Sequence, residues 1–404
     1  MADSSEAILI ELDNDSATKA DITSALINLA ELWKDATQAN FMGIHGAAIV
    51  EKLVVNYILR WAPYMLPEHR ASITDILFSQ SAAHLTFFAL AEALTMAKVL
   101  RNPGASKHLV LLVTQFCERR CFLTMLTSWS TNGDLASGSA LMGNDLLLNE
   151  RIASTMLSIP NRIANMLGCI GADKQFNIDC DAYVQQLGEA VAVAVSRGGN
   201  LPIIHIALLG KACFLQNFSL FLSPILHVLA SLSCSSTAFK LFSVPDRAVE
   251  HLCRELVKYI AAGAHHWIMG VLVDLVNNHR QYRFVLTEKF LYSRYFKETS
   301  VAVAIVELLV MLQLELTTFD VITHVWGSQT VLDDCSYLHQ FYLTKIVLLL
   351  QQRLSAQECS QYMMSIVAAV PRFIQHTESN IRMLGMLTAV VFTGRVSTNV
   401  PVCG

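Results

Sequence analysis

The chain has 404 residues, of which 53% are hydrophobic and 15% are charged. Because charged residues make up about 25% of an average soluble protein, this composition excludes a disordered chain and indicates extensive burial. The formal net charge of -4 excludes a general electrostatic attraction to nucleic acid or to an acidic membrane surface.

Apolar residues recur at helical spacing from the start of the chain. The first predicted helix is capped by Asp21, and the second presents one apolar face and stops before Pro63. The inward positions of these two helices are Ile22, Ala25, Leu29, Leu32, Ile49, Leu53, Tyr57 and Trp61. Two long helices, 82–100 and 108–129, are predicted next, and Asn102-Pro103-Gly104 separates them as a helix breaker. Arg119 and Arg120 are expected to point outward.

The longest interruption is 130–145, which is rich in Ser, Gly and Asn. It predicts a flexible loop between a first helical segment, 1–129, and a second one, 146–397, with a tail at 398–404. In the second segment, Pro160 is expected to start a new helix and Pro224 to split 201–232 into a buried pair. Further helices are predicted at 181–196, from Pro245 onward, and at 264–277, 282–292, 298–316, 318–326, 336–353, 355–375 and 380–393.

The last predicted hairpin shows how these helices must assemble. Ser379 and Asn380 are residue types that cap a helix start, and Ile381, Leu384 and Leu387 then share one face. Gly385 lies inside that helix, where it costs about 1 kcal/mol relative to alanine, so a close neighbouring helix is expected there. One hairpin has no complete core and must stack on others. With no apolar-polar alternation typical of strands, the sequence predicts an all-α, irregular HEAT-like α-solenoid of the armadillo type.

Hydropathy and the distribution of cysteines indicate in which cellular compartment the chain is expected. The run 212–239 has no charged side chain until Lys240, but it contains Gln216, Asn217, Pro224 and His227, so two buried helices are favoured over a membrane span. The ten cysteines are scattered through apolar runs, and the acidic first residues do not resemble a secretory leader. We therefore expect reduced thiols and a location in the cytoplasm and nucleus.

The sequence contains no motif for a catalytic, metal or cofactor site. Gly133, Gly138 and Gly143 lack the lysine of a phosphate-binding loop, and no Cys-x-x-Cys or His-Glu-x-x-His occurs. Asp333-Asp334 is expected to cap the next helix, not to act in acid-base catalysis. We predict a protein without enzymatic activity and without a cofactor.

One stretch, 277–297, mixes basic and aromatic side chains. Its basic members are His279, Arg280, Arg283, Lys289, Arg294 and Lys297. Phe284, Leu291 and Tyr295 are predicted to form a buried stripe with a solvated basic edge. Two alternatives stay open: contact with a protein partner, and binding of single-stranded or telomeric DNA by phosphate pairing and base stacking.

A set of short segments in a fixed order carries a family resemblance. They are 157–165 (LSIPNRIAN), 209–213 (LGKAC), 244–248 (VPDRA), 284–289 (FVLTEK), 325–328 (VWGS) and 380–386 (NIRMLGM). Over about 157–396 the chain resembles the N-terminal solenoid of the telomere length regulation family.

The resemblance implies a scaffold without catalytic residues. Members of that family join two other solenoid proteins in the TTT complex and work with heat-shock protein 90 and the Pontin/Reptin co-chaperone complex. Their clients are phosphatidylinositol-3-kinase-related kinases such as mTOR, ATM and ATR, so the family affects telomere length, DNA-damage checkpoints and growth signalling. The expected partner contacts in this chain are Arg280, Arg283, Lys289 and Arg382, around apolar grooves; a generic HEAT-type docking solenoid is a further alternative.

The family also has a phosphorylated acidic linker and a second helical domain after this region. These 404 residues do not contain them, so recruitment of the co-chaperone through that linker is not expected of this polypeptide.

Overall fold

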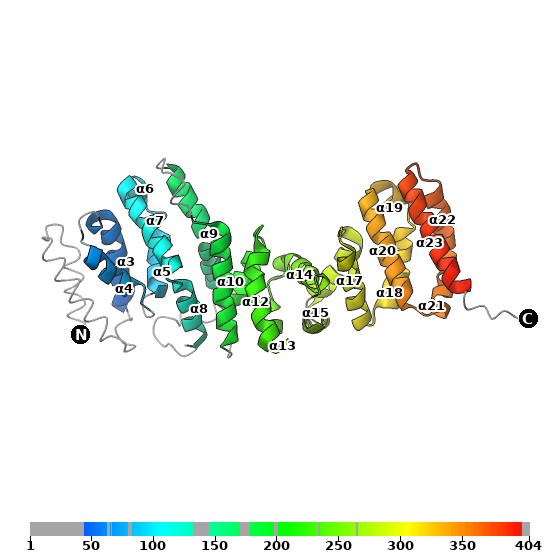
Figure 1. Cartoon of the computed structure of the whole chain (residues 1–404), viewed down its shortest axis with the longest axis horizontal. Helices are drawn as coiled ribbons and strands as arrows, with labels where there is room; N and C mark the ends of the chain where they lie inside the picture. The colour runs from blue at the N-terminus through cyan, green and yellow to red at the C-terminus, as the bar shows by residue number, and fades with distance from the viewer. Residues whose placement is uncertain are drawn as a thin grey trace, which may run out of the picture. The chain divides into compact units, whose positions relative to one another are not determined.

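The computed structural model describes residues 44–62, 65, 67–79, 83–131, 146–169, 178–197, 201–232, 235–263 and 266–397. Within these residues all regular structure is helical (Figure 1). The predicted helix at Asp21, most of the predicted loop 130–145 and the predicted tail lie outside the described residues. By its contacts the chain divides into unit 1, Met1–Leu241, and unit 2, Phe242–Gly404.

In unit 1 each helix packs against neighbouring helices in the sequence and against helices of the next helical pair. Its described helices are α3 (Ile44–Asn56), the π-helical turn η1 (Tyr57–Trp61), α4 (Pro67–Leu77), α5 (Ala83–Ala93), α6 (Ala97–Leu100), α7 (Pro103–Glu118), α8 (Cys121–Thr131), α9 (Leu146–Cys169), α10 (Cys180–Ser196), α11 (Ile203–Ala212) and α12 (Phe218–Leu232), with α13 (Ser235–Phe242) reaching the boundary.

The core of unit 1 is aromatic where α5, α7, α8 and α10 meet. Phe122 makes edge-to-face contacts with Phe116 at 5.1 Å between ring centroids and with Tyr183 at 5.5 Å. Next to this cluster α10 and α12 approach so closely that a Cβ atom at Gly188 would clash with the backbone of Phe221. Helices from both sides of the predicted loop 130–145 therefore share one core.

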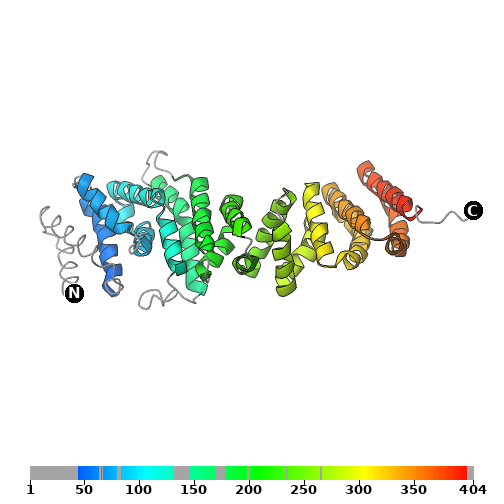
Figure 2. The same cartoon turned by 60° about the horizontal axis from the view of Figure 1, so that its bottom comes forward.

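Unit 2 contains the remaining helices. They are α14 (Asp246–Ala261), α15 (His266–Asn278), α16 (Arg280–Phe284), the π-helix η4 (Val285–Ser293), α17 (Thr299–Met311), α18 (Glu315–Trp326), α19 (Gln329–Asp334), α20 (Tyr337–Arg353), α21 (Ala356–Gln361), α22 (Met363–Ile374) and α23 (Ser379–Ser397). Figures 1 and 2 both show α22 and α23 side by side, as their contacts require.

The core of unit 2 ties successive helices together through large side chains. Trp326 of α18 stacks on Phe373 of α22 with 4.2 Å between ring centroids. A Cβ atom at Gly385 of α23 would clash with the side chain of Phe373, so the close helix approach predicted at this glycine is confirmed. The buried hydroxyl of Tyr342 donates to the carbonyl of Phe290 at 2.7 Å and joins α20 to η4.

The predicted fold class, an all-α solenoid of irregular HEAT-like helical pairs, is confirmed. No helix among the described residues is both long and apolar enough to span a membrane. The division after Leu241 was not predicted, whereas the predicted boundary at 130–145 stays a prediction.

Several predicted helix ends were wrong for identifiable reasons. Asn102 begins α7, since its side chain accepts a hydrogen bond from the Ala105 amide and Pro103 occupies the first turn. The predicted helix 108–129 instead breaks at Arg119 and Arg120 between α7 and α8. Pro224 lies inside α12, and α11 and α12 separate at 213–217.

Pro160 also lies inside a helix, α9, which continues through it. A proline there cannot donate to the carbonyl four residues earlier, which belongs to Met156. The hydroxyl of Tyr183 in α10 donates to that carbonyl at 2.6 Å. Because the freed acceptor is satisfied by a neighbouring helix, α9 does not have to end at its proline.

Asp333 and Asp334 were predicted to cap the next helix, and this was wrong as well. Both residues end α19, and the α20 cap is Ser336, whose side chain accepts from the His339 amide.

Candidate functional site

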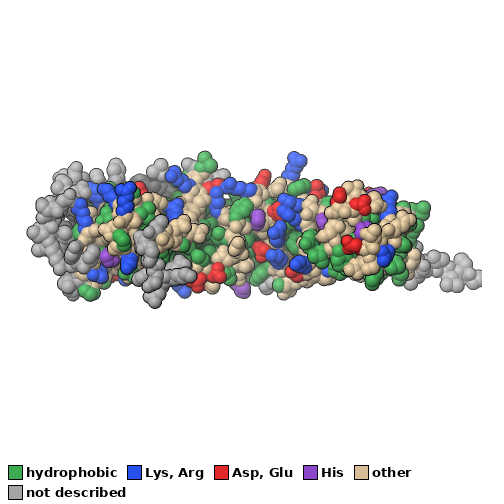
Figure 3. All heavy atoms as spheres, turned by 90° about the horizontal axis from the view of Figure 1, so that it is seen from above, with side chains coloured by type: hydrophobic (Ala, Val, Ile, Leu, Met, Phe, Trp, Pro, Cys, Tyr) green, Lys and Arg blue, Asp and Glu red, His purple; other side chains and the backbone are tan. Residues whose placement is uncertain are grey.

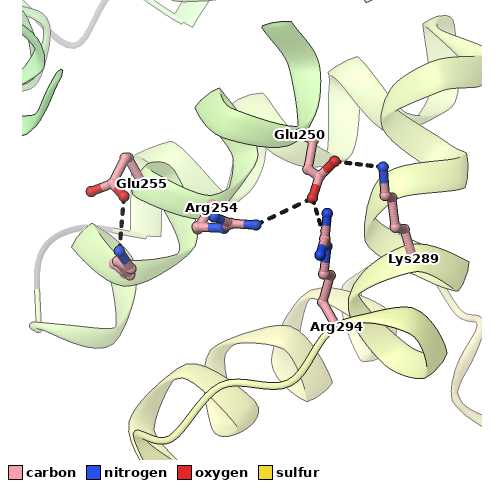
Figure 4. Close-up of polar contacts among 6 residues, drawn as sticks. Glu250, Arg254, Glu255, Lys289 and Arg294 are labelled. Carbon is pink, nitrogen blue, oxygen red and sulfur yellow. Dashed lines mark hydrogen bonds and ion pairs between the residues drawn. The ribbon is translucent and has the colours of Figure 1, made fainter. Parts of the chain in front are cut away.

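The basic stretch of the sequence folds against α14 in unit 2. Alpha-14 is amphipathic, and it buries Val249, Leu252 and Leu256 while Glu250 remains near the surface. The Glu250 carboxylate contacts Lys289 Nζ at 2.5 Å and Arg294 Nε at 3.0 Å (Figure 4). Arg254, one turn along the same helix, adds its Nη2 at 3.2 Å. One carboxylate thus gathers three cations from α14, η4 and the residue that follows η4.

This arrangement leaves the cluster with an excess of positive charge. Burial by itself raises the pKa of the Glu250 carboxyl, but hydrogen bonds and charge attraction from Lys289 and Arg294 outweigh it, so the pKa is lowered. Glu250 of α14 therefore stays ionised. Its carboxylate holds Lys289 of η4 and Arg294, the residue after η4, against α14. Lys289, predicted as a partner contact, is held in this internal cluster.

Arg280 and Arg283 lie differently. Both side chains are exposed on α16, and within the described residues neither guanidinium has a hydrogen bond or ion pair. Phe284 next to them is 42% exposed. Figure 3 shows Lys and Arg side chains gathered around α14 to α17, with carboxylates among them. We call the exposed set Arg280, Arg283 and Phe284 the basic face.

The predicted buried stripe of this stretch was only partly right. Leu291 is fully buried, but Phe284 and Tyr295 are exposed, and Tyr282, Leu286 and Phe290 are buried in their place. Residues 285–293 form a π-helix, in which one turn holds more residues than an α-helix. Residues chosen at α-helical spacing therefore do not all lie on the buried face of this segment.

A second surface lies on the last two helices of unit 2. Most exposed side chains of α22, apart from Arg372, are apolar, and so are those in the middle of α23, where Leu387 had been predicted to point inward. The exposed apolar side chains are Met364, Val367, Ile374, Met383, Met386, Leu387 and Val390. We call this set the apolar face. Met364, Met383 and Val390 are 77%, 62% and 68% exposed, and Figure 3 shows hydrophobic side chains over this end of unit 2.

The fourth predicted contact, Arg382, lies beside the apolar face. Its Nη1 donates to the carbonyls of His376 at 2.9 Å and Thr377 at 2.8 Å. The guanidinium therefore satisfies two carbonyl groups of the turn between α22 and α23 and stabilises this helical hairpin. Its role in partner contact stays a prediction.

Among the described residues, no cluster of three or more His, Cys, Asp or Glu side chains could hold a metal ion. Cys117 in the last turn of α7 and Cys121 at the start of α8 lie on either side of the break at Arg119 and Arg120, and both are buried free thiols. Burial raises the pKa of Cys117 to about 12 and that of Cys121 to about 11, so both remain protonated at neutral pH and behave as small apolar side chains.

Comparison with known proteins finds similarity to one group of relatives. No protein-family model matches the chain. A mouse protein named Telomere length regulation protein TEL2 homolog is 25% identical over 277 residues, which cover 63% of this chain. The protein of the same name from Xenopus laevis is 23% identical over 387 residues and covers 90%. The predicted resemblance to the telomere length regulation family is confirmed.

The matches cover only part of these family members. They span 32% of the mouse protein and 44% of the Xenopus laevis protein, so the chain spans less than half the length of the TEL2 homologs it matches. A crystal structure of an engineered protein aligns with 96% of this chain at 11% identity and a TM-score of 0.26, which is too low to support any conclusion.

Proposed function

We propose that this chain is a scaffold without enzymatic activity that binds other helical proteins in telomere length regulation. The observation that carries the proposal is the apolar face of α22 and α23, exposed in a chain similar to the TEL2 homologs. Exposed apolar side chains gathered on two neighbouring helices are typical of protein interaction sites. Its three methionines suit partners of varied shape, because the unbranched thioether side chain adapts to them.

The proposed partners follow from the family. They are the other solenoid subunits of the TTT complex, heat-shock protein 90 with the Pontin/Reptin co-chaperone complex, and phosphatidylinositol-3-kinase-related kinases. The chain would hold these kinases during folding in the cytoplasm and nucleus, and would thereby support telomere maintenance, checkpoint and growth signalling. The similarity to the TEL2 homologs supports this proposal over part of their length.

The apolar face suggests how such holding would work. Met383, Met386 and Val390 follow one another at helical spacing, and no charged side chain lies between Arg382 and Arg395 on α23. An apolar helix from a partner would bury this stripe in the manner of one more solenoid layer. Binding of this kind gains most of its free energy from removal of apolar surface from water.

Co-precipitation from cells tests the proposal. The tagged chain should recover TTT subunits and kinases of this class, and the double variant Met383→Glu/Val390→Glu should lose them, because two charges would be buried in the interface. The matched control Asn380→Glu/Thr393→Glu adds the same charges at exposed polar positions of α23 and should retain binding. If a full-length relative recovers these proteins and the wild-type chain recovers none, the proposal is wrong.

The basic face favours one other function, binding of single-stranded or telomeric DNA. Arg280 and Arg283 are exposed without an ion pair among the described residues, beside the exposed ring of Phe284. Affinity should then fall steeply with salt, and Arg280→Glu/Arg283→Glu should abolish a gel shift. A shift that this charge reversal does not change excludes the function.

A further inference from the structure

The ion cluster at Glu250 holds more positive charge than its own carboxylate neutralises. Glu250 of α14 pairs with Arg254 of the same helix, with Lys289 of η4 and with Arg294, which follows η4. Among the described residues, none of these three cations forms an ion pair with any other carboxylate. Three positive charges around one negative charge therefore leave two in excess at neutral pH.

The neighbouring carboxylates do not cancel this excess. Glu255, the next acidic residue of α14, pairs with Lys258 at 2.8 Å, and Figure 4 shows it apart from Glu250. Glu288 precedes Lys289 in η4, but its exposed side chain pairs with no cation of the cluster within the part of the chain that the structure describes. The excess positive charge therefore remains where α14 meets the end of η4.

The cations keep N–H groups that are available to a ligand. Arg294 uses its Nε on Glu250 at 3.0 Å, so its Nη1 and Nη2 have no hydrogen bond among the described residues. Arg254 uses only its Nη2 on the same carboxylate. The side chains of Arg294, Arg254 and Lys289 are 51%, 34% and 30% exposed, so a ligand can reach all three from solvent.

Glu250 also positions the cations before any ligand binds. Its own side chain is only 15% exposed, and it stays ionised because Lys289 and Arg294 lower its pKa. One fixed carboxylate thus holds three long side chains in one place. A ligand gains affinity from such a site because less side-chain freedom is lost on binding.

The geometry favours a single group with two negative charges. The paired nitrogens of Arg254, Lys289 and Arg294 all lie within 3.2 Å of one carboxylate, so they converge on a point and do not form a row. A phosphorylated serine or threonine carries a charge of about -1.5 to -2 at pH 7 and three acceptor oxygens. An Asp or Glu carboxylate brings one charge, and single-stranded DNA spreads single charges along a groove.

We propose that the Glu250 cluster binds a phosphoserine or phosphothreonine in a segment of a partner protein, with the phosphate on Arg294 and within reach of Arg254 and Lys289. Arginine can donate two parallel hydrogen bonds to a phosphate, and arginine clusters are typical of sites that recognise phosphorylated segments. The inference goes beyond the proposed function, because it does not involve the apolar face of α22 and α23.

Fluorescence anisotropy with the purified whole chain tests the proposal. The probes are labelled pools of short peptides with randomised flanks around a central phosphoserine, phosphothreonine, unphosphorylated serine or glutamate. The phosphorylated pools should bind about tenfold or more tightly than the serine and glutamate pools. Inorganic phosphate should displace them, and their affinity should fall with added salt.

Substitutions locate the site. Arg294→Gln should weaken binding of the phosphorylated pools about tenfold or more. Arg294→Lys keeps a positive charge beside Glu250 but loses the planar guanidinium, so it should also bind weakly while its urea unfolding midpoint stays close to that of the wild type. The matched control Lys258→Gln removes one positive charge from the same helix outside the cluster and should change binding less than about twofold.

Three results overturn the proposal. They are equal binding of the phosphorylated and serine pools, equal weakening by Arg294→Gln and Lys258→Gln, and tighter Arg294-dependent binding of a single-stranded oligonucleotide or of phosphatidylcholine vesicles that contain a phosphatidylinositol bisphosphate. The apolar-face variant Met383→Glu/Val390→Glu should bind the phosphorylated pools as the wild type does. Because that variant tests the proposed function through loss of the solenoid partners, a failure of either proposal can be told from a failure of the other.

Discussion

Glu250 determines how the cations of unit 2 are presented to a partner. Its carboxylate fixes Lys289 and Arg294, whereas Arg280 and Arg283 stay exposed. The sequence places all of these side chains in one basic stretch, except for Glu250 and Arg254, which lie on a preceding helix. Periodicity finds which face of a helix is polar, but it does not show which distant carboxylate that face meets. For this reason Lys289 could not be separated from Arg280 and Arg283 before the structure was known.

Removal of the Glu250 charge should destabilise unit 2. Glu250→Gln leaves Arg254, Lys289 and Arg294 close together without their anion, so at pH 7 the midpoint of urea unfolding should fall. The folded-state pKa of Glu250 is lowered from its ordinary value of 4.5. The stabilisation is therefore complete above pH 4.5 and disappears as the pH falls through the folded-state pKa.

The difference between wild type and Glu250→Gln should consequently vanish in acid and shrink with added salt. Arg353→Gln, which removes a more exposed ion pair with Glu307 at 3.5 Å, serves as the control and should change stability little. A difference that is the same at pH 7 and pH 3 would contradict the assignment of the effect to the Glu250 charge.

Whole helices were predicted well wherever the period was regular and the ends were capped. Buried positions such as Ile49, Leu53 and Tyr57 lie where their spacing placed them. The errors occurred where tertiary contacts override a local signal. Pro160 reads as a helix start, yet α9 passes through it because Tyr183 satisfies the carbonyl that the proline frees. Likewise, the buried stripe predicted at α-helical spacing does not match the buried face of the π-helix η4.

The pairing of Pro160 with Tyr183 predicts a coupled pair of substitutions. Tyr183→Phe should lower the free energy of unfolding by about 1–3 kcal/mol, since the buried Met156 carbonyl loses its donor. In a Pro160→Ala background the new amide at position 160 can donate to that carbonyl, so the same substitution should cost clearly less. Chemical unfolding of the four proteins measures the coupling, and equal costs in both backgrounds would disprove it.

Gly385 and Gly394 provide a matched pair on α23. Gly385→Ala should destabilise the chain by about 1–3 kcal/mol, because its Cβ atom would clash with Phe373 of α22. At Gly394 no atom lies within 4 Å of a built Cβ, so Gly394→Ala should stabilise the helix by up to about 1 kcal/mol. Thermal unfolding of both variants tests the close approach of the two helices, and a neutral Gly385→Ala would contradict it.

At the scale of the whole molecule, the sequence was sufficient to predict the fold class but not the proposed binding surface. An all-α stack follows from amphipathic helices that have no complete core in single hairpins. The apolar face was not predicted residue by residue, because Leu387 and its neighbours have the same apolar character as core residues. Sequence alone does not distinguish an apolar stripe that another helix of the chain covers from an apolar stripe that stays exposed. The apolar face of α22 and α23 depends on which helix packs beside which.

Our central claim is that the chain binds helical protein partners through the exposed apolar face. Hydrogen-deuterium exchange of the purified chain, alone and mixed with the purified solenoid subunits of the TTT complex, tests it most directly. We predict slower exchange in α22 and α23 on mixing, and no such change for Met383→Glu/Val390→Glu. Complex formation with unchanged exchange across 363–397, or no complex at all, would contradict the claim.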